Sequence, residues 1–211
     1  MRNVVVYMKN GIHEGLWSDH DISLKEYQTQ IPSAESIKAM EKELGYKFPD
    51  SYLEFMKGHN GGLVEKCRYA YADPETNREN EVIINGFLGI GSDKPNTIMG
   101  TFGSKFWIEE WEYPDIGIVI CDCPSAGHDL VFLDYRECGP EGEPCVSHVD
   151  QEADYEITKI ADSFEMFVDG LGFEKEEEIE TSKVMLHSTP KRDAPVARIR
   201  IKLLEMFKKK F

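Results

Sequence analysis

The stretch that decides the fold is IPSAESIKAMEKELGYKFPDSYLEFMKGHNGG, residues 31–62. Ser33 follows a proline and has the side chain of a helix N-cap, so a helix is expected to begin there. Apolar residues then recur at helical spacing and form one stripe. They are Ile37, Met40 and Leu44. Gly45 is expected to end this helix in the left-handed conformation that glycine adopts readily.

The second half of the stretch predicts another helix. Pro49 suits a first turn, because its missing amide hydrogen would have no partner there. The expected buried face consists of Tyr52, Phe55 and Met56. The run Asn60, Gly61 and Gly62 should end the helix, because glycine permits the positive dihedral angles that the chain needs to enter a sheet. We therefore predict a helical hairpin and assign Asn60, Gly61 and Gly62 a structural role.

Strands are expected downstream of this hairpin. EVII and FLGI flank Asn85 and Gly86, a pair that predicts a tight β-hairpin turn. Residues 117–121 form a β-branched run typical of a buried central strand. Residues 130–135 and 145–149 predict two more strands.

Two further helices are indicated. The segment FWIEEWEYPD predicts a short helix that ends before Pro114. Asp162 and Glu165 have the spacing of a capping box, and the apolar residues after Asp162 recur at helical spacing. Beyond Gly172 comes the acidic run EKEEEIE, and then the basic, alternating ARIRIKL, which fits a strand or a helix equally well.

Charge is unevenly distributed along the 211 residues. The formal net charge is −15, from 39 acidic and 24 basic residues. From Thr181 onward the charge is +7, so the preceding residues carry −22. Such a body repels phosphate backbones, and we therefore expect no direct binding to nucleic acid. It would attract a basic protein. The alternative is that the negative charge only keeps the protein soluble, which is equally consistent with these net charges.

Composition narrows the class of protein further. Five cysteines, an odd number, occur in a chain whose first residues lack a signal-peptide pattern, so reduced thiols are expected. No run of residues is apolar and long enough to span a bilayer. We therefore expect a cytoplasmic protein without a membrane partner.

The order of these elements resembles the SUKH superfamily, and within it the Smi/Knr group of cell-wall regulators and immunity proteins. The resemblance rests on the hairpin ending in NGG, the FLGI strand, FWIEEW…YPDIG, CDCPSAGHDLVFLDY and ADSFEMFVDGL. It implies a single α+β domain over residues 31–172, with a mixed, mostly antiparallel sheet and packed helices. Residues 1–30 would be an N-terminal extension and residues 173–211 an acidic linker with a basic C-terminal extension.

The same resemblance implies a function. Bacterial members of the superfamily are similar to immunity proteins, which are encoded beside toxins and neutralise them by direct binding. The expected protein is thus a non-catalytic antitoxin without a cofactor, and its partner is a cognate toxin that is basic and targets nucleic acid. The alternatives are a regulatory or scaffold protein of cell-wall-related signalling and a zinc-binding protein.

One aromatic and acidic group is the main candidate for contact with a partner. On a helix, Trp107 and Trp111 share a face, because they are four residues apart. Aromatic anchors among carboxylates suit a basic partner. The candidate residues are Trp107, Glu109, Glu110, Trp111 and Glu112, with Asp73 and Glu75 as an acidic rim. The alternative is that both tryptophans belong to the core.

Several potential metal ligands lie close together in the sequence. They are Cys121, Cys123, His128, Cys138, Cys145 and His148. The spacing C-x-C differs from the paired C-x-x-C of zinc knuckles, so no metal site is predicted. A nucleophilic arrangement of Cys123, His128 and Asp129 would need the three side chains to meet in space, and their proximity in sequence does not establish that. We therefore predict no catalytic residues.

Overall fold

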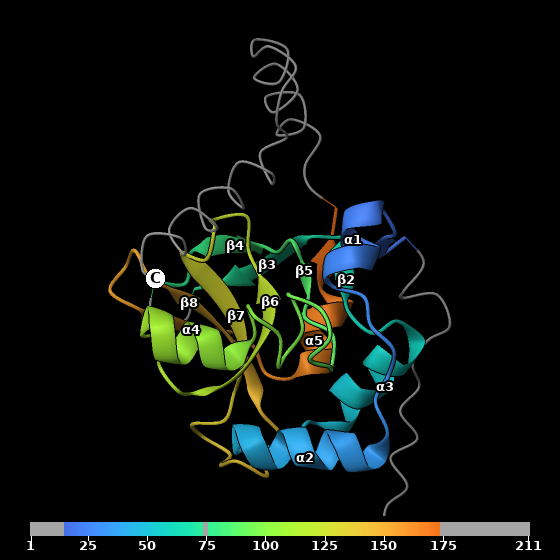
Figure 1. Ribbon diagram of the computed structural model, residues 1–211. Helices are drawn as coiled ribbons and strands as arrows, with labels where there is room; N and C mark the ends of the chain where they lie inside the picture. The colour runs from blue at the N-terminus through green and yellow to red at the C-terminus, as the bar shows by residue number, and fades with distance from the viewer. Residues whose placement is uncertain (1–14, 74–75, 174–211) are drawn as a thin grey trace, which may run out of the picture.

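The expected helical hairpin is present in the computed structural model, which describes residues 15–73 and 76–173 (Figure 1). Helix α2, Ala34–Leu44, begins after Ser33, whose Oγ accepts a hydrogen bond from the Ser36 amide at 3.2 Å. It ends at Gly45, where φ is +80°. Helix α3, Asp50–Gly58, starts one residue later than predicted, because Pro49 is its N-cap and not its first residue.

The main sheet has the strand order β1-β2-β5-β6-β7-β8-β9, and every neighbouring pair is antiparallel. Its strands are β1 Trp17–Ser18, β2 Gly62–Val64, β5 Gly86–Phe87, β6 Gly117–Asp122, β7 Asp129–Asp134, β8 Cys145–Asp150 and β9 Glu156–Ala161. The strands expected around residues 117, 130 and 145 are thus confirmed as β6, β7 and β8. Both β6 and β7 are almost wholly buried, as their apolar composition predicts.

A second, smaller sheet has the order β10-β3-β4. Its strands are β3 Arg68–Ala72, β4 Glu79–Ile83 and β10 Leu171–Gly172. The ring of Tyr69 in β3 lies 5.0 Å from that of Phe167 in helix α5, Phe164–Asp169. The N-cap of α5 is Ser163, whose side chain accepts from the Met166 amide, so the predicted cap at Asp162 was wrong by one residue.

The predicted hairpin turn at Asn85 and Gly86 was wrong. At this point the chain passes from one sheet to the other. The Ile84 amide donates to the Cys67 carbonyl beside the small sheet, whereas the Asn85 amide donates to the Asp122 carbonyl in the main sheet, both at 2.8 Å. Glycine is needed at position 86 because a Cβ there would lie 2.4 Å from the Gly62 carbonyl oxygen.

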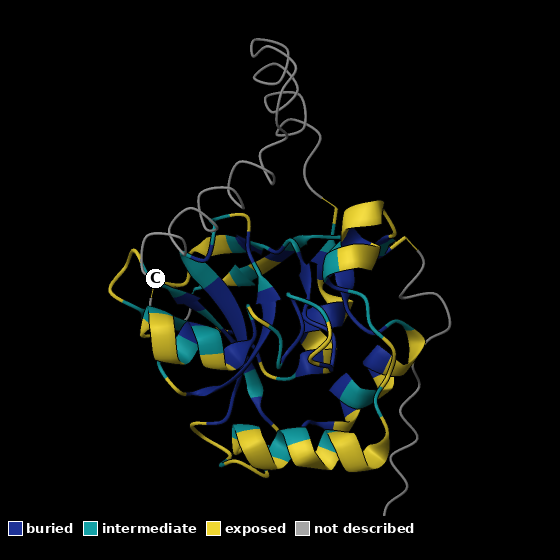
Figure 2. Ribbon diagram, viewed as in Figure 1, coloured by how far each residue is buried: buried dark blue, intermediate teal, exposed yellow. Residues whose placement is uncertain are grey.

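The helices cover both faces of the main sheet. Phe87, Cys121 and Val131 are paired across β5, β6 and β7 and share one face, which is covered by α3 and α5 through Phe55 and Phe164. Phe132 and its neighbours on the opposite face lie under Tyr113, which follows helix α4, Ser104–Trp111. Figure 2 shows the buried strands in dark blue, with exposed residues on the outer sides of the helices.

The residues before the hairpin also belong to this architecture. Strand β1 pairs with β2 at the edge of the main sheet, and Leu16 beside it is buried. Helix α1, Asp21–Glu26, follows. No described helix has both the length and the apolar character needed to cross a bilayer. The predicted acidic linker and basic C-terminal segment lie outside the described residues, and the predicted domain limits stay predictions.

Candidate functional site

Three loops meet at one end of the main sheet. They are the end of α4, the turn from β6 to β7 and the turn from β8 to β9. The Tyr155 hydroxyl donates to the Trp111 carbonyl oxygen at 2.6 Å. The Trp111 ring lies 6.1 Å from that of His128, edge to face, and Nδ1 of His128 is hydrogen-bonded to the Gln151 side chain at 2.8 Å. These contacts bring together three half-buried aromatic rings from separate parts of the chain.

The end of α4 and the turn from β8 into β9 also carry six exposed carboxylates. They are Glu109, Glu110, Glu112, Glu152, Asp154 and Glu156. Among the described residues, no lysine or arginine forms an ion pair with any of them, and His128 lies 4.0 Å from Glu152. The hydrogen bond to Glu43 first, and then the charges of Glu43 and Glu109, raise the pKa of Lys105, so the charge of Glu109 acts on that lysine without a direct pair. We call the six carboxylates, with Trp111, His128 and Tyr155, the acidic–aromatic surface. Sequence reasoning identified its α4 part but missed the β8–β9 turn, because only the fold brings the two together.

Trp107 does not belong to this surface. Its side chain is 4% exposed, and its indole N–H donates to the Phe102 carbonyl at 2.8 Å. It packs so closely on the turn before β7 that a Cβ at Gly127 would lie 2.4 Å from the ring. The expectation of an exposed Trp107 was therefore wrong, and the alternative core role is the correct one for this residue. Trp111, one turn later, is only half-buried.

The expected acidic rim is described in part. Glu75 lies outside the described residues. Asp73 organises the β3–β4 turn, because its Oδ1 accepts hydrogen bonds from the amide and the hydroxyl of Thr76. Burial first, and then the charges of Asp73 and Glu156, raise the pKa of Tyr71. Strand β3, which carries Tyr71, contacts strand β9, which begins at Glu156.

Asn60, Gly61 and Gly62 hold the backbone together. Gly61 has φ of +81°, and a Cβ there would lie 2.5 Å from the Gly89 amide nitrogen. The Asn60 side chain is bonded to both main-chain groups of Ile90 and also donates to the Gln30 carbonyl at 3.1 Å. In the structure, these three residues join the end of α3 to the chain after β5.

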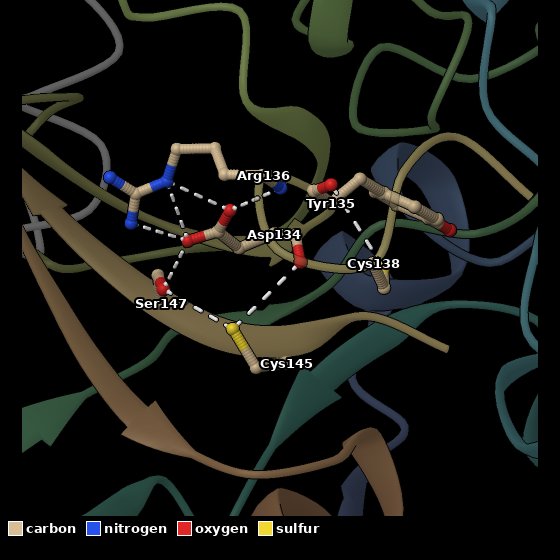
Figure 3. Close-up of polar contacts among 6 residues, drawn as sticks. All are labelled: Asp134, Tyr135, Arg136, Cys138, Cys145 and Ser147. Atoms are coloured by element: carbon tan, nitrogen blue, oxygen red, sulfur yellow. Dashed lines mark hydrogen bonds and ion pairs between the residues drawn. The ribbon is translucent and has the colours of Figure 1, made fainter. Parts of the chain in front are cut away.

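The six potential metal ligands noted in the sequence do not form one cluster. Figure 3 shows Cys145 beside the Asp134 carbonyl oxygen and Cys138 beside that of Tyr135. The Cys138 sulfur also lies near the Gly139 carbonyl oxygen. Burial raises the pKa of Cys145 and Cys138, so both thiols stay protonated at neutral pH.

Asp134 itself belongs to a structural network. It is 2% exposed, and it accepts hydrogen bonds from the Arg136 guanidinium and from Ser147 Oγ, the latter at 2.7 Å (Figure 3). Burial opposes ionisation, but these hydrogen bonds outweigh it and lower the pKa of Asp134. The network ties the end of β7 to β8.

At the opposite end of β7, Cys123 and Asp129 meet His148, and their donor atoms all lie within 4.8 Å of one another. His148 occupies the place that sequence reasoning considered for His128, which instead contacts Gln151. Burial raises the pKa of Cys123 well above its usual value. A buried, protonated thiol is a poor nucleophile, so this geometry gives no support to the nucleophilic arrangement that was considered.

Comparison with models of known protein families gives a match. The model of the SMI1 / KNR4 family (SUKH-1) matches residues 31–170, which is more than half of the 211 residues. The matched range includes α2 to α5, both sheets except β1 and β10, and all described residues of the acidic–aromatic surface. No curated protein matches the chain.

Proposed function

The chain belongs to the SMI1 / KNR4 family (SUKH-1), and from that premise we propose that it is an immunity protein that neutralises a toxin domain by binding it directly. The family is consistent with this role. The toxin is basic and acts on nucleic acid. The immunity protein blocks it by occupying its surface and catalyses no reaction itself.

One observation supports this function best. The segments that carry Trp111 and Tyr155 hold six exposed carboxylates, and among the described residues none of the six forms an ion pair with a lysine or an arginine. Carboxylates that serve only solubility do not require aromatic residues beside them. A protein-binding surface gains from such residues, because aromatic side chains contribute much of the binding energy of protein interfaces. The unpaired charges also attract a basic partner over a long range and so raise the rate of encounter.

The test begins with the genes beside that of this chain, and a gene for a secreted protein with a C-terminal toxin domain supplies the partner. The full chain is co-expressed with this domain, and both cell survival and complex formation are measured. We expect survival and a stable complex. The double variant Trp111→Ala/Glu110→Lys should weaken the complex at least tenfold, because it removes a central contact and reverses a nearby charge.

The matched control is Asp169→Lys, an exposed residue at the end of α5, which should leave the complex intact. Near-UV circular dichroism verifies that both variants are folded. Failure of the folded wild-type chain to bind the toxin domain or to protect cells would contradict the proposed function. Binding without protection would favour a regulatory or scaffold role.

A further inference from the structure

Three side chains from adjacent strands converge at the end of the main sheet that carries the acidic–aromatic surface. Cys123 directly follows β6, Asp129 is the first residue of β7, and His148 lies in β8. Nε2 of His148 is 2.8 Å from Oδ2 of Asp129. All three donor atoms lie within 4.8 Å of one another. We propose that Cys123, Asp129 and His148 bind a divalent transition-metal ion, and that Zn²⁺ is the ion that these donors suit best.

The donor set matches the coordination chemistry of zinc. Zinc binds thiolate sulfur, imidazole nitrogen and carboxylate oxygen in tetrahedral sites. With bonds of about 2.3 Å to sulfur and about 2.0–2.1 Å to nitrogen or oxygen, tetrahedral ligand atoms are roughly 3.3–3.6 Å apart. To reach this spacing, the 2.8 Å between His148 and Asp129 must lengthen by about half an ångström, and the distances to Cys123, which are within 4.8 Å, must shorten by at most about 1.2 Å. On binding, the metal–sulfur bond replaces the Cys123 S–H bond, and the thiol proton passes to solvent. His148 changes to the neutral tautomer with its proton on Nδ1, so that Nε2, which donates to Asp129 in the metal-free protein, has a free lone pair for the metal.

The strand register provides a second reason for a cation. Asp129 is directly opposite Asp150 across β7 and β8. Like charges directly opposite on neighbouring strands destabilise a sheet. Among the described residues, neither carboxylate pairs with a lysine or an arginine; Asp129 contacts His148, and Asp150 accepts from the amides of Glu152 and Ala153. A dication bound at Asp129 would add a positive charge beside this pair of carboxylates.

The solvent exposure of the site and its position in the backbone also suit metal binding. The side chains of His148 and Asp129 are 14% and 22% exposed, so one side of the site faces solvent and a water molecule can complete the coordination. Cys123 and Asp129 flank the turn of residues 124–128, which presents His128 to the acidic–aromatic surface. Metal binding would hold both ends of this turn. The metal proposal itself does not depend on the identity of the protein partner.

The first experiment measures metal binding to the full chain. The purified protein is stripped with a chelator and titrated with Co²⁺, whose thiolate charge-transfer band and visible spectrum report sulfur ligation and four-coordinate geometry. We expect one thiolate-ligated Co²⁺ per chain, displaced by Zn²⁺. Zinc at a hundredfold excess over its dissociation constant should raise the melting temperature by about 5–10 °C.

Single substitutions identify the ligands. Cys123→Ser should abolish the thiolate band, and His148→Gln and Asp129→Asn should each weaken binding at least tenfold. The controls are His128→Gln and Cys145→Ser, a nearby histidine and a half-buried thiol that lie outside the site; both should bind like the wild type. Because His148 is near the surface, His148→Gln remains informative if Cys123→Ser fails to fold. Absence of a thiolate band in the wild type, or equal binding by wild type and His148→Gln, would overturn the proposal.

Discussion

The side chain of Asn60 pairs with the main chain of Ile90 as a neighbouring strand would. Its Oδ1 accepts from the Ile90 amide at 2.7 Å, and its Nδ2 donates to the Ile90 carbonyl at 2.9 Å. Asn60 is 4% exposed, so no water replaces these bonds easily. The end of α3 is thereby joined to the chain that follows β5.

Replacing Asn60 should therefore destabilise the protein strongly. Asn60→Ala leaves both main-chain groups of Ile90 buried without a partner, and each such group costs about 1–3 kcal/mol. We expect the free energy of unfolding, measured by urea denaturation, to fall by about 2–5 kcal/mol. Asn80→Ala is the control, since the exposed Asn80 bonds only the adjacent Glu81 amide, and it should cost below about 1 kcal/mol. Equal effects of the two substitutions would contradict this role.

The sequence predicted those features of the fold that depend on residues close together in the chain. The caps at Ser33 and Gly45 and the buried strand at residues 117–121 follow from side-chain chemistry within a few residues. The bond from Asn60 to Ile90 spans 30 residues, so no local pattern contains it. The prediction of a hairpin turn at Asn85 and Gly86 was wrong for the same reason. Glycine is required at position 86 by the close approach of Gly62, which lies in another strand.

The two tryptophans of α4 should differ in their effects on stability. Trp107 is buried, bonded to the Phe102 carbonyl and packed against Gly127. Trp107→Ala should lower the free energy of unfolding by about 3–5 kcal/mol, because it leaves a large cavity. Trp111→Ala should cost about 1–2 kcal/mol, because that ring is only half-buried. Urea denaturation of both variants tests this order, and a greater loss for Trp111→Ala would refute it.

The Asp134 network predicts a pH dependence. The pKa of Asp134 is lowered below its ordinary 3.8, so its contribution to stability is complete above about pH 5 and is lost as the pH falls through the folded-state pKa. Asp134→Asn removes charge-assisted hydrogen bonds and should cost about 2–3 kcal/mol at pH 7. The difference from the wild type should shrink as the pH falls below 3.8. Urea denaturation at pH 7 and pH 3 measures it.

The control for this pH dependence is Glu137→Gln, an exposed neighbour in the same turn. Its effect on the free energy of unfolding should stay within about 0.5 kcal/mol at both pH values. A destabilisation by Asp134→Asn that is the same at pH 7 and pH 3 would show that the ionised carboxylate is not the source of the stability.

Of the candidate site, only the segment that forms the end of α4 could be predicted from the sequence. FWIEEWEYPD indicated an aromatic and acidic helix end, and α4 confirms the helix. The buried position of Trp107 depends on Gly127, and the approach of Tyr155 depends on the β8–β9 turn. The convergence of Cys123, Asp129 and His148 follows from the register of three strands, which their spacing in the sequence does not reveal.

The acidic–aromatic surface should control how fast a basic partner binds. Glu110→Lys/Glu152→Lys reverses two charges beside Trp111 and His128, and should slow association with the basic toxin domain about tenfold at low salt. Glu54→Lys/Asp169→Lys changes the net charge equally but on α3 and α5, and should slow it much less. Stopped-flow measurements across a range of salt concentrations separate the two. The wild-type rate should fall steeply with salt, because ions screen the attraction. Equal rates for the two double variants would show that net charge alone, and not this surface, guides the encounter.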